Sequence, residues 1–174
     1  MNDNNFAGNS KSAVDFLGNV WNYDCMGCAI SRGEIKIPGG IIYEGKYTIL
    51  GADPEIPIPG FFIINVKRHI NSFSELRKEE RTEIGNVIIY AEKALKELNI
   101  VKEVTLVQEE RSKHLHIWIF PNYNWMDEKF GKGITYLRAI SEYAQKNINE
   151  DGIKEVLNVI KKTRKYFNKY NINE

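Results

Sequence analysis

Residues 113–120 constrain the fold more than any other segment, because their side chains alternate between two kinds. After Lys113 the odd-numbered positions are aliphatic: Leu115, Ile117 and Ile119. The even-numbered positions carry aromatic rings: His114, His116, Trp118 and Phe120. Successive side chains of a β-strand point to opposite faces, so the pattern predicts a strand whose aliphatic face lies in the core. The other face presents two imidazoles and an indole side by side, which is unusual for a strand with a purely structural role.

Short apolar runs between turn residues predict the other strands. Segments 41–43 and 47–50 flank Glu44-Gly45-Lys46, whose glycine suits a hairpin. Residues 53–60 hold three prolines and therefore predict a loop. The remaining predicted strands are 61–66 and 104–108.

Helical spacing of apolar residues is clearest in residues 74–98, where Lys and Glu occupy the other side. Residues 11–21 carry a weaker stripe that predicts a short helix: Val14, Phe16, Leu17 and Val20. Two more helices are predicted at about 133–146 and 152–168. The last one has a basic face, which fits either a solvated surface or an anionic partner: Lys154, Lys161, Lys162, Arg164 and Lys165.

This order of elements predicts an α+β domain, with an antiparallel sheet and a long central helix. The 174 residues fit one domain. Residues 1–121 form the predicted core, and residues 122–174 form a helical C-terminal extension packed on the same domain.

Composition indicates a globular chain without a strong electrostatic preference. Its net charge is +1, with 43% hydrophobic and 27% charged residues, so no overall field favours nucleic acid or an anionic membrane. Apolar runs such as 61–64 are too short to cross a bilayer. Residues 1–10 are polar and Asn-rich, unlike a signal peptide. We therefore expect a cytoplasmic protein that does not bind membranes.

The two cysteines occur together as Cys25-Met-Gly-Cys28. A structural disulfide is not expected in a reducing cytosol, which leaves metal binding, redox chemistry or an inert buried pair. A thioredoxin-like redox pair follows a strand and opens a helix. Here the pair follows Asn22-Tyr23-Asp24 and precedes a short Gly-bearing stretch.

Several segments, in order along residues 23–121, resemble the histidine-triad (HIT) superfamily. His114-Leu-His116-Ile-Trp118-Ile-Phe-Pro121 is similar to the triad signature, with Trp118 in the place of the third histidine. Residues 53–69 resemble the family's Asp, Pro-Gly, apolar strand and Lys-Arg-His segment, and residues 71–76 resemble the start of its helix. Residues 25–35 are similar to the Cys-x-x-Cys…Gly-Glu-Ile stretch of zinc-bearing members. The resemblance implies a HIT-like antiparallel sheet.

The resemblance also implies a structural Zn²⁺ site. Its ligands in this chain are Cys25, Cys28, His69 and His114. Two thiolates and two imidazoles form a closed tetrahedral set that suits zinc. Metal binding would then be part of folding.

His116 takes the place of the family's nucleophile, which attacks the α-phosphorus of a nucleotide and forms a nucleotidyl-histidine. Its other ring nitrogen then needs an acceptor, commonly a backbone carbonyl, to direct the attacking lone pair. Asp53 matches the residue that binds the ribose hydroxyls. On local grounds alone, Asp53 before Pro54 is equally typical of a turn cap.

One stretch departs from the family pattern. Active members carry Gly-Gln-Ser/Thr-Val before the triad, whereas this chain has Glu109-Glu110-Arg111-Ser112. Arg111 or Ser112 are then the candidate phosphate donors, together with the indole N–H of Trp118. Loss of a transition-state donor typically lowers a rate by about 10²–10³.

Three functions therefore remain open: a hydrolase of a nucleoside phosphate or dinucleoside polyphosphate, a nucleotidyltransferase or phosphorylase, and a catalytically silent nucleotide-binding protein stabilised by zinc. The first is the leading prediction. The resemblance further implies a homodimer formed through the long helix and its neighbouring strand.

Overall fold

The computed structural model of the chain describes residues 10–170 and 172. The first nine residues, which bear on the expected lack of a signal peptide, lie outside the described residues. So do residues 171, 173 and 174, at the end of the predicted extension.

A five-stranded antiparallel sheet forms the centre of the molecule, with the strand order β3-β4-β5-β7-β6. The strands are β3 (Tyr43–Glu44), β4 (Thr48–Ala52), β5 (Phe62–Val66), β6 (Glu103–Val107) and β7 (His116–Asn122). The predicted antiparallel α+β class is thereby confirmed. Strand β7 begins three residues later than predicted, because a short 3-10 turn at Glu110–Ser112 ends at Lys113 in the left-handed region, with φ 55°.

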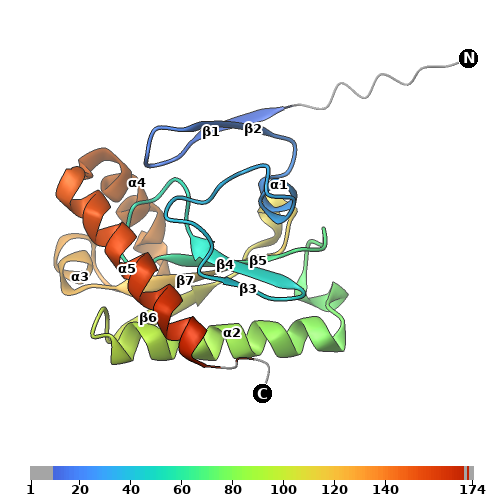
Figure 1. Cartoon of the computed structure of the whole chain (residues 1–174). Helices are drawn as coiled ribbons and strands as arrows, with labels where there is room; N and C mark the ends of the chain where they lie inside the picture. The colour runs from blue at the N-terminus through green and yellow to red at the C-terminus, as the bar shows by residue number, and fades with distance from the viewer. Residues whose placement is uncertain (1–9, 171, 173–174) are drawn as a thin grey trace, which may run out of the picture.

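The two faces of the sheet carry different side chains, as the alternation in β7 predicts. Leu115, Ile117 and Ile119 are buried in the main core with the helix α2 (Lys78–Glu97). Trp118 and Phe120 belong to a second cluster on the opposite face. Figure 1 shows α2 on one side of the sheet and the β1–β2 hairpin on the other.

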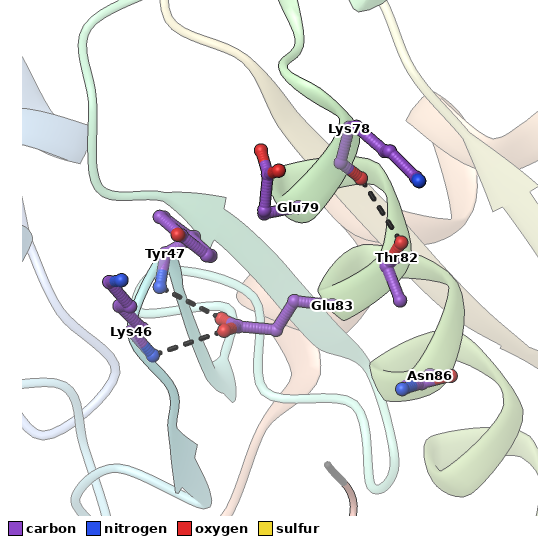
Figure 2. A pocket seen from close by; sticks show the side chains of 7 residues that line it. All are labelled: Lys46, Tyr47, Lys78, Glu79, Thr82, Glu83 and Asn86. Carbon is purple, nitrogen blue, oxygen red and sulfur yellow. Dashed lines mark hydrogen bonds between the residues drawn. The ribbon is translucent and has the colours of Figure 1, made fainter. Parts of the chain in front are cut away.

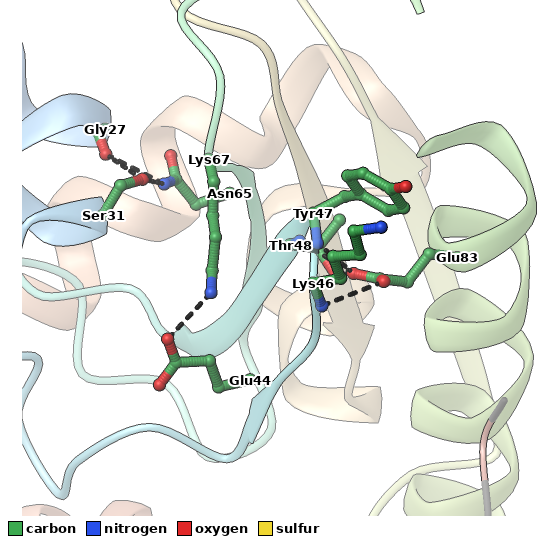
Figure 3. Close-up of polar contacts among 9 residues, drawn as sticks. All are labelled: Gly27, Ser31, Glu44, Lys46, Tyr47, Thr48, Asn65, Lys67 and Glu83. Carbon is green, nitrogen blue, oxygen red and sulfur yellow. Dashed lines mark hydrogen bonds and ion pairs between the residues drawn. The ribbon is translucent and has the colours of Figure 1, made fainter. Parts of the chain in front are cut away.

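Helix α2 buries one apolar side and begins with acidic residues that complement its dipole, Glu79 and Glu80. Its buried Glu83 closes the turn between β3 and β4: its carboxylate accepts from the backbone N–H groups of Lys46, Tyr47 and Thr48 at 2.8–3.1 Å (Figures 2 and 3). A cavity of about 360 Å³ lies beside this junction. Because these three N–H groups already bond the Glu83 carboxylate, we interpret Glu83 as a structural link between α2 and the β3–β4 hairpin.

The predicted helix at residues 11–21 is wrong. These residues form the hairpin β1 (Lys11–Val14) and β2 (Val20–Tyr23). Gly18 adopts φ 86° in its turn, and the buried Asp15 carboxylate accepts from the N–H groups of Leu17 and Asn19. Two residues of the supposed apolar stripe, Val14 and Val20, are instead 55% and 62% exposed.

Three helices follow β7, of which the first was not predicted. They are α3 (Asn124–Phe130), α4 (Leu137–Asn147) and α5 (Glu150–Lys169). Met126, Leu137 and Ile140 pack in the second cluster, whereas Val156, Ile160 and Phe167 of α5 pack in the main core with α2. The boundary between core and extension at residue 121 stays a prediction.

The basic face of α5 is divided between two environments. Arg164 donates hydrogen bonds to the carbonyls of Gly39 and Ile41, so it fastens α5 to the preceding loop. The lysines of this face are exposed. An anionic partner for them stays untested. None of the described helices has the length and apolar character needed to cross a membrane.

Candidate functional site

Cys25, Cys28, His69 and His114 lie together, with one ligand atom of each within 4.8 Å of the others. Cys25 Sγ is 3.2 Å from His114 Nδ1, and Cys28 Sγ is 3.2 Å from His69 Nδ1. The other two sulfur–nitrogen distances are 3.5 and 3.6 Å. The two Nδ1 atoms are 3.3 Å apart. Segments separated by up to 89 residues in the chain thus converge on one point.

These distances fit a tetrahedral zinc site. Zn–S bonds of about 2.3 Å and Zn–N bonds of about 2.05 Å at the tetrahedral angle place sulfur and nitrogen about 3.6 Å apart, and two nitrogens about 3.3 Å apart. The buried His114 ring is also oriented, since its Nε2 lies 2.7 Å from the carbonyl oxygen of Val66. That contact puts the proton on Nε2 and leaves Nδ1 as the ligand, the usual support of a metal-bound histidine.

The chain brings the cysteines to this point through β2 and a short helix, α1 (Met26–Ser31), with Cys25 as its N-cap. The pair therefore does follow a strand and open a helix, contrary to our reading of the sequence. Its nearest polar neighbours are two histidines, which favours metal over redox chemistry. Without a cation, burial and the adjacent Cys25 raise the pKa of Cys28 to about 11. A bound divalent ion would deprotonate both thiols.

Asn65 fixes α1 on the sheet. Its amide donates to the carbonyl of Gly27 at 2.9 Å and to Ser31 Oγ at 3.0 Å (Figure 3). Asn65 is also the cross-strand partner of His116. The metal ligands on α1 and the imidazole on β7 therefore share one support, which the sequence analysis did not identify.

His116 carries the hydrogen bond that the resemblance calls for. Its Nδ1 lies 2.9 Å from the backbone oxygen of His114 and 3.3 Å from Ser112 Oγ. Ser112 itself donates to the same carbonyl at 3.0 Å. A carbonyl accepts only, so Nδ1 holds the proton and Nε2 keeps an unshared electron pair.

A cavity of about 560 Å³ adjoins both the metal cluster and His116. Its walls combine aliphatic side chains with a few polar groups, as is usual for small-molecule sites. The aliphatic wall comprises Ile30, Ile37, Ile49, Ala52 and Ile63. The polar and aromatic wall includes Asp53, Ser112, His116 and Trp118.

Asp53 lines this cavity and also caps a turn. Its Oδ1 accepts from the N–H groups of Glu55 and Ile56, both at 2.8 Å. Burial raises the pKa of Asp53 to about 7, although these two hydrogen bonds lower it. The turn-cap reading is thus observed. Ribose binding stays a prediction, with Oδ2 unpaired among the described residues.

The residues that replace the family's phosphate-binding stretch divide into two groups. Ser112 and Trp118 line the cavity. Trp118 packs edge-on against Phe61, with ring centroids 5.2 Å apart. Arg111 does not line the cavity: its side chain is 75% exposed, and its guanidinium pairs with Glu109. Arg111 has no place at this site in the described structure, and its binding role stays untested.

The cavity wall also holds polar side chains that the sequence did not indicate, among them Lys11, Tyr23 and Lys113. Burial raises the pKa of Tyr23, and the negative charges of Glu55 and Cys25 add to this effect. A helix at residues 11–21 would keep Lys11 and Tyr23 far apart, whereas the hairpin pairs them side by side.

The chain matches no known family model and no curated protein. The chain is similar to solved structures, and the three described next share low sequence identity with it.

Three solved structures illustrate this likeness. A histidine-triad nucleotide-binding protein from Sulfolobus tokodaii, described as hypothetical, has a TM-score of 0.58 at 17% identity, covering 81% of this chain and 92% of that one. A Zn-bound histidine triad family protein from Mycobacterium smegmatis has a TM-score of 0.55 at 15% identity, covering 79% and 93%. A HIT family protein from Bacillus anthracis has a TM-score of 0.54 at 20% identity, covering 79% and 94%. The chain has the histidine-triad fold, as the motifs predicted.

Proposed function

We propose that this chain is a zinc-stabilised nucleotide-binding protein that hydrolyses a nucleoside phosphate or dinucleoside polyphosphate through His116. The observation that carries the proposal is the hydrogen bond from His116 Nδ1 to the carbonyl of His114. The Nε2 electron pair is therefore available to attack phosphorus, on a side chain that lines the cavity of about 560 Å³. The nucleotide-binding and Zn-bound structures of the same fold support the assignment.

The reaction would proceed in two displacements. In the first, His116 Nε2 forms a bond to the α-phosphorus as the bond to the leaving group breaks, and the leaving group departs with the bonding pair. In the second, water attacks phosphorus, the phosphorus–nitrogen bond breaks, and its electrons return to Nε2 while a proton passes to solvent. His116 is regenerated as the neutral imidazole.

The zinc site has a structural part in this proposal. Cys25, Cys28, His69 and His114 would hold the ion in a closed set without an open position for substrate. When bound, the ion supplies charge that keeps both thiolates ionised and joins α1 to the sheet. His114 connects this site to the reaction, since its carbonyl holds His116.

A catalytically silent nucleotide-binding protein is the second candidate function, and two observations favour it. Arg111 pairs with Glu109 instead of lining the cavity. Trp118, in the place of the third histidine, packs against Phe61 and cannot relay a proton. The transferase or phosphorylase alternative has no observation of its own in its favour.

The deciding experiment is incubation with a panel of α-³²P-labelled nucleoside triphosphates and dinucleoside polyphosphates, followed by acid and base treatment of the protein. We expect an acid-labile, base-stable label that is absent from His116→Ala. Leu106→Ala serves as the control, because Leu106 is an exposed residue of the adjacent strand β6 outside the cavity wall, and this variant should retain the label. Binding without any label would identify the silent protein, and label in His116→Ala would exclude His116 as the nucleophile. Dependence of turnover on added phosphate would identify a phosphorylase.

Two other expectations accompany this proposal without a structural test: a cytoplasmic location, and a homodimer formed through α2 and the neighbouring strand. Sedimentation of the purified chain measures the second directly.

A further inference from the structure

The β1–β2 hairpin forms one wall of the cavity that adjoins His116. Lys11 opens the hairpin and Tyr23 closes it, and both residues line the cavity. We propose that Tyr23 contacts the base of the bound nucleotide, so that this hairpin contributes to recognition of the nucleoside. The inference rests on the proposed function, since it requires a nucleotide in this cavity.

The register of the hairpin directs Tyr23 inward. Lys11 pairs with Tyr23, and Ala13 pairs with Trp21. Side chains two positions apart share a face, so these four residues project from the same side. Ala13 is buried, and Trp21 and Tyr23 are half-buried, whereas Val14, Val20 and Asn22 of the other side are exposed. The inner face of the hairpin is thus the face toward the cavity.

The hairpin is held in place at both ends. In its turn, Asp15 accepts hydrogen bonds from Leu17, Asn19 and Trp21. The next residue, Phe16, donates its N–H to the carbonyl of Pro54 at 2.9 Å. At the other end, β2 leads through Asp24 to the metal-site residue Cys25. A wall fixed in this way presents Tyr23 without a large ordering cost on binding.

The position of Tyr23 favours the nucleoside over the phosphates. Tyr23 lines the same cavity as Glu55 and Asp53, the predicted ribose partner. The cavity also contains the aliphatic side chains of Ile30, Ile37 and Ile49. A cavity lined by a phenol ring and aliphatic side chains is a suitable environment for a flat base, and stacking of a base on an aromatic side chain contributes about 1–3 kcal/mol.

The test compares ligands with and without a base. Calorimetry measures binding of AMP, GMP, CMP, UMP and ribose 5-phosphate to wild type, Tyr23→Ala, Tyr23→Phe and Asn22→Ala. Asn22 is the matched control, because it is the preceding residue on the exposed side of β2. Equal zinc content and melting temperature in all four proteins show that the metal site two residues away is intact.

We expect Tyr23→Ala to bind the preferred monophosphate about 5- to 150-fold more weakly. Ribose 5-phosphate should bind all four proteins equally, and Tyr23→Phe and Asn22→Ala should match wild type for every ligand. Unchanged monophosphate binding in Tyr23→Ala would overturn this inference alone. An equal loss of monophosphate and ribose 5-phosphate binding would overturn it too, because contact with the base would then be irrelevant. If wild type binds none of the monophosphates, the proposed function falls as well.

Discussion

A Cβ atom at position 27 would lie 2.4 Å from His114 Cδ2 and 2.6 Å from Asn65 Oδ1. Neither group can yield easily, because the His114 ring is held by Val66 and the Asn65 amide by Gly27 and Ser31. The glycine of Cys25-Met-Gly-Cys28 is therefore a packing requirement of the metal centre, a role that its sequence context alone does not reveal.

We expect Gly27→Ala to destabilise the fold by about 1–3 kcal/mol through overpacking and to lower zinc content. Gly85→Ala is the control, since a Cβ there meets nothing within 4 Å and alanine favours the helix α2. Thermal melting and metal analysis of both variants measure the effect. A Gly27→Ala protein with normal zinc and stability would contradict the tight contact between α1 and His114.

Asp53 should make the stability of the protein depend on pH. Its folded pKa of about 7 lies above the reference value of 3.8, because burial disfavours the charged form. The contribution of the buried, protonated Asp53 to the free energy of unfolding is therefore fully present below pH 3.8. It is lost as pH rises through about 7.

Asp53→Asn keeps an acceptor for the N–H groups of Glu55 and Ile56 but cannot ionise. The variant should exceed wild type in stability at pH 8 by up to about 4 kcal/mol, and the two should converge near pH 4. Urea unfolding across this pH range measures the difference. Parallel curves for the two proteins would show that Asp53 does not titrate with a raised pKa.

Among the elements, the β1–β2 hairpin depends on one buried side chain. The Asp15 carboxylate accepts from the backbone N–H groups of Leu17 and Asn19, from the Asn19 amide and from the Trp21 indole. The side-chain hydrogen bonds of the turn converge on this carboxylate, so its removal should loosen the turn, while Phe16 still donates to the carbonyl of Pro54.

We expect Asp15→Ala to cost about 1–3 kcal/mol in the hairpin, because buried donors lose their acceptor. Amide exchange of Leu17 and Asn19 should accelerate, while exchange in α2 stays unchanged if opening is local. Ser12→Ala on the exposed side of β1 is the control. Exchange that rises equally throughout the chain would indicate global destabilisation instead.

At the level of the whole molecule, the Cys/His cluster joins α1, the segment after β5 and the segment before β7. Zinc that binds only the folded chain stabilises it by mass action, by about 2.7 kcal/mol when the free ion is at 100 times its dissociation constant. Chelation should then lower the melting temperature by about 5–10 °C.

Calorimetric melting before and after dialysis against a chelator, with zinc added back, measures this effect. Cys25→Ser and Cys28→Ser should melt at the lower temperature whether or not zinc is present. Protein purified without chelator should contain about one zinc per chain. A metal-free, fully stable protein would exclude His69 and His114 as structural ligands.

Local sequence patterns were sufficient to predict the strands of the central sheet, the helix α2 and the four residues of the metal cluster. Alternation in residues 114–120 reports strand faces directly, since the period of a strand is two. The Cys-x-x-Cys pair and the three histidines are a short list of zinc ligands, so spacing and family resemblance sufficed to group them. The turn at Gly18 was missed because Val14, Leu17 and Val20 also satisfy a helical period over so short a segment.

What remained for the tertiary structure was everything that depends on contacts between distant segments. Sequence alone indicated that His116 needs an acceptor, but only the folded chain places the His114 carbonyl 2.9 Å away. It also sets Tyr23 into the cavity wall and turns Arg111 toward Glu109. Side-chain periodicity is a local property, whereas which groups face one cavity depends on how separate elements pack, and that packing is decided by burial of the whole core.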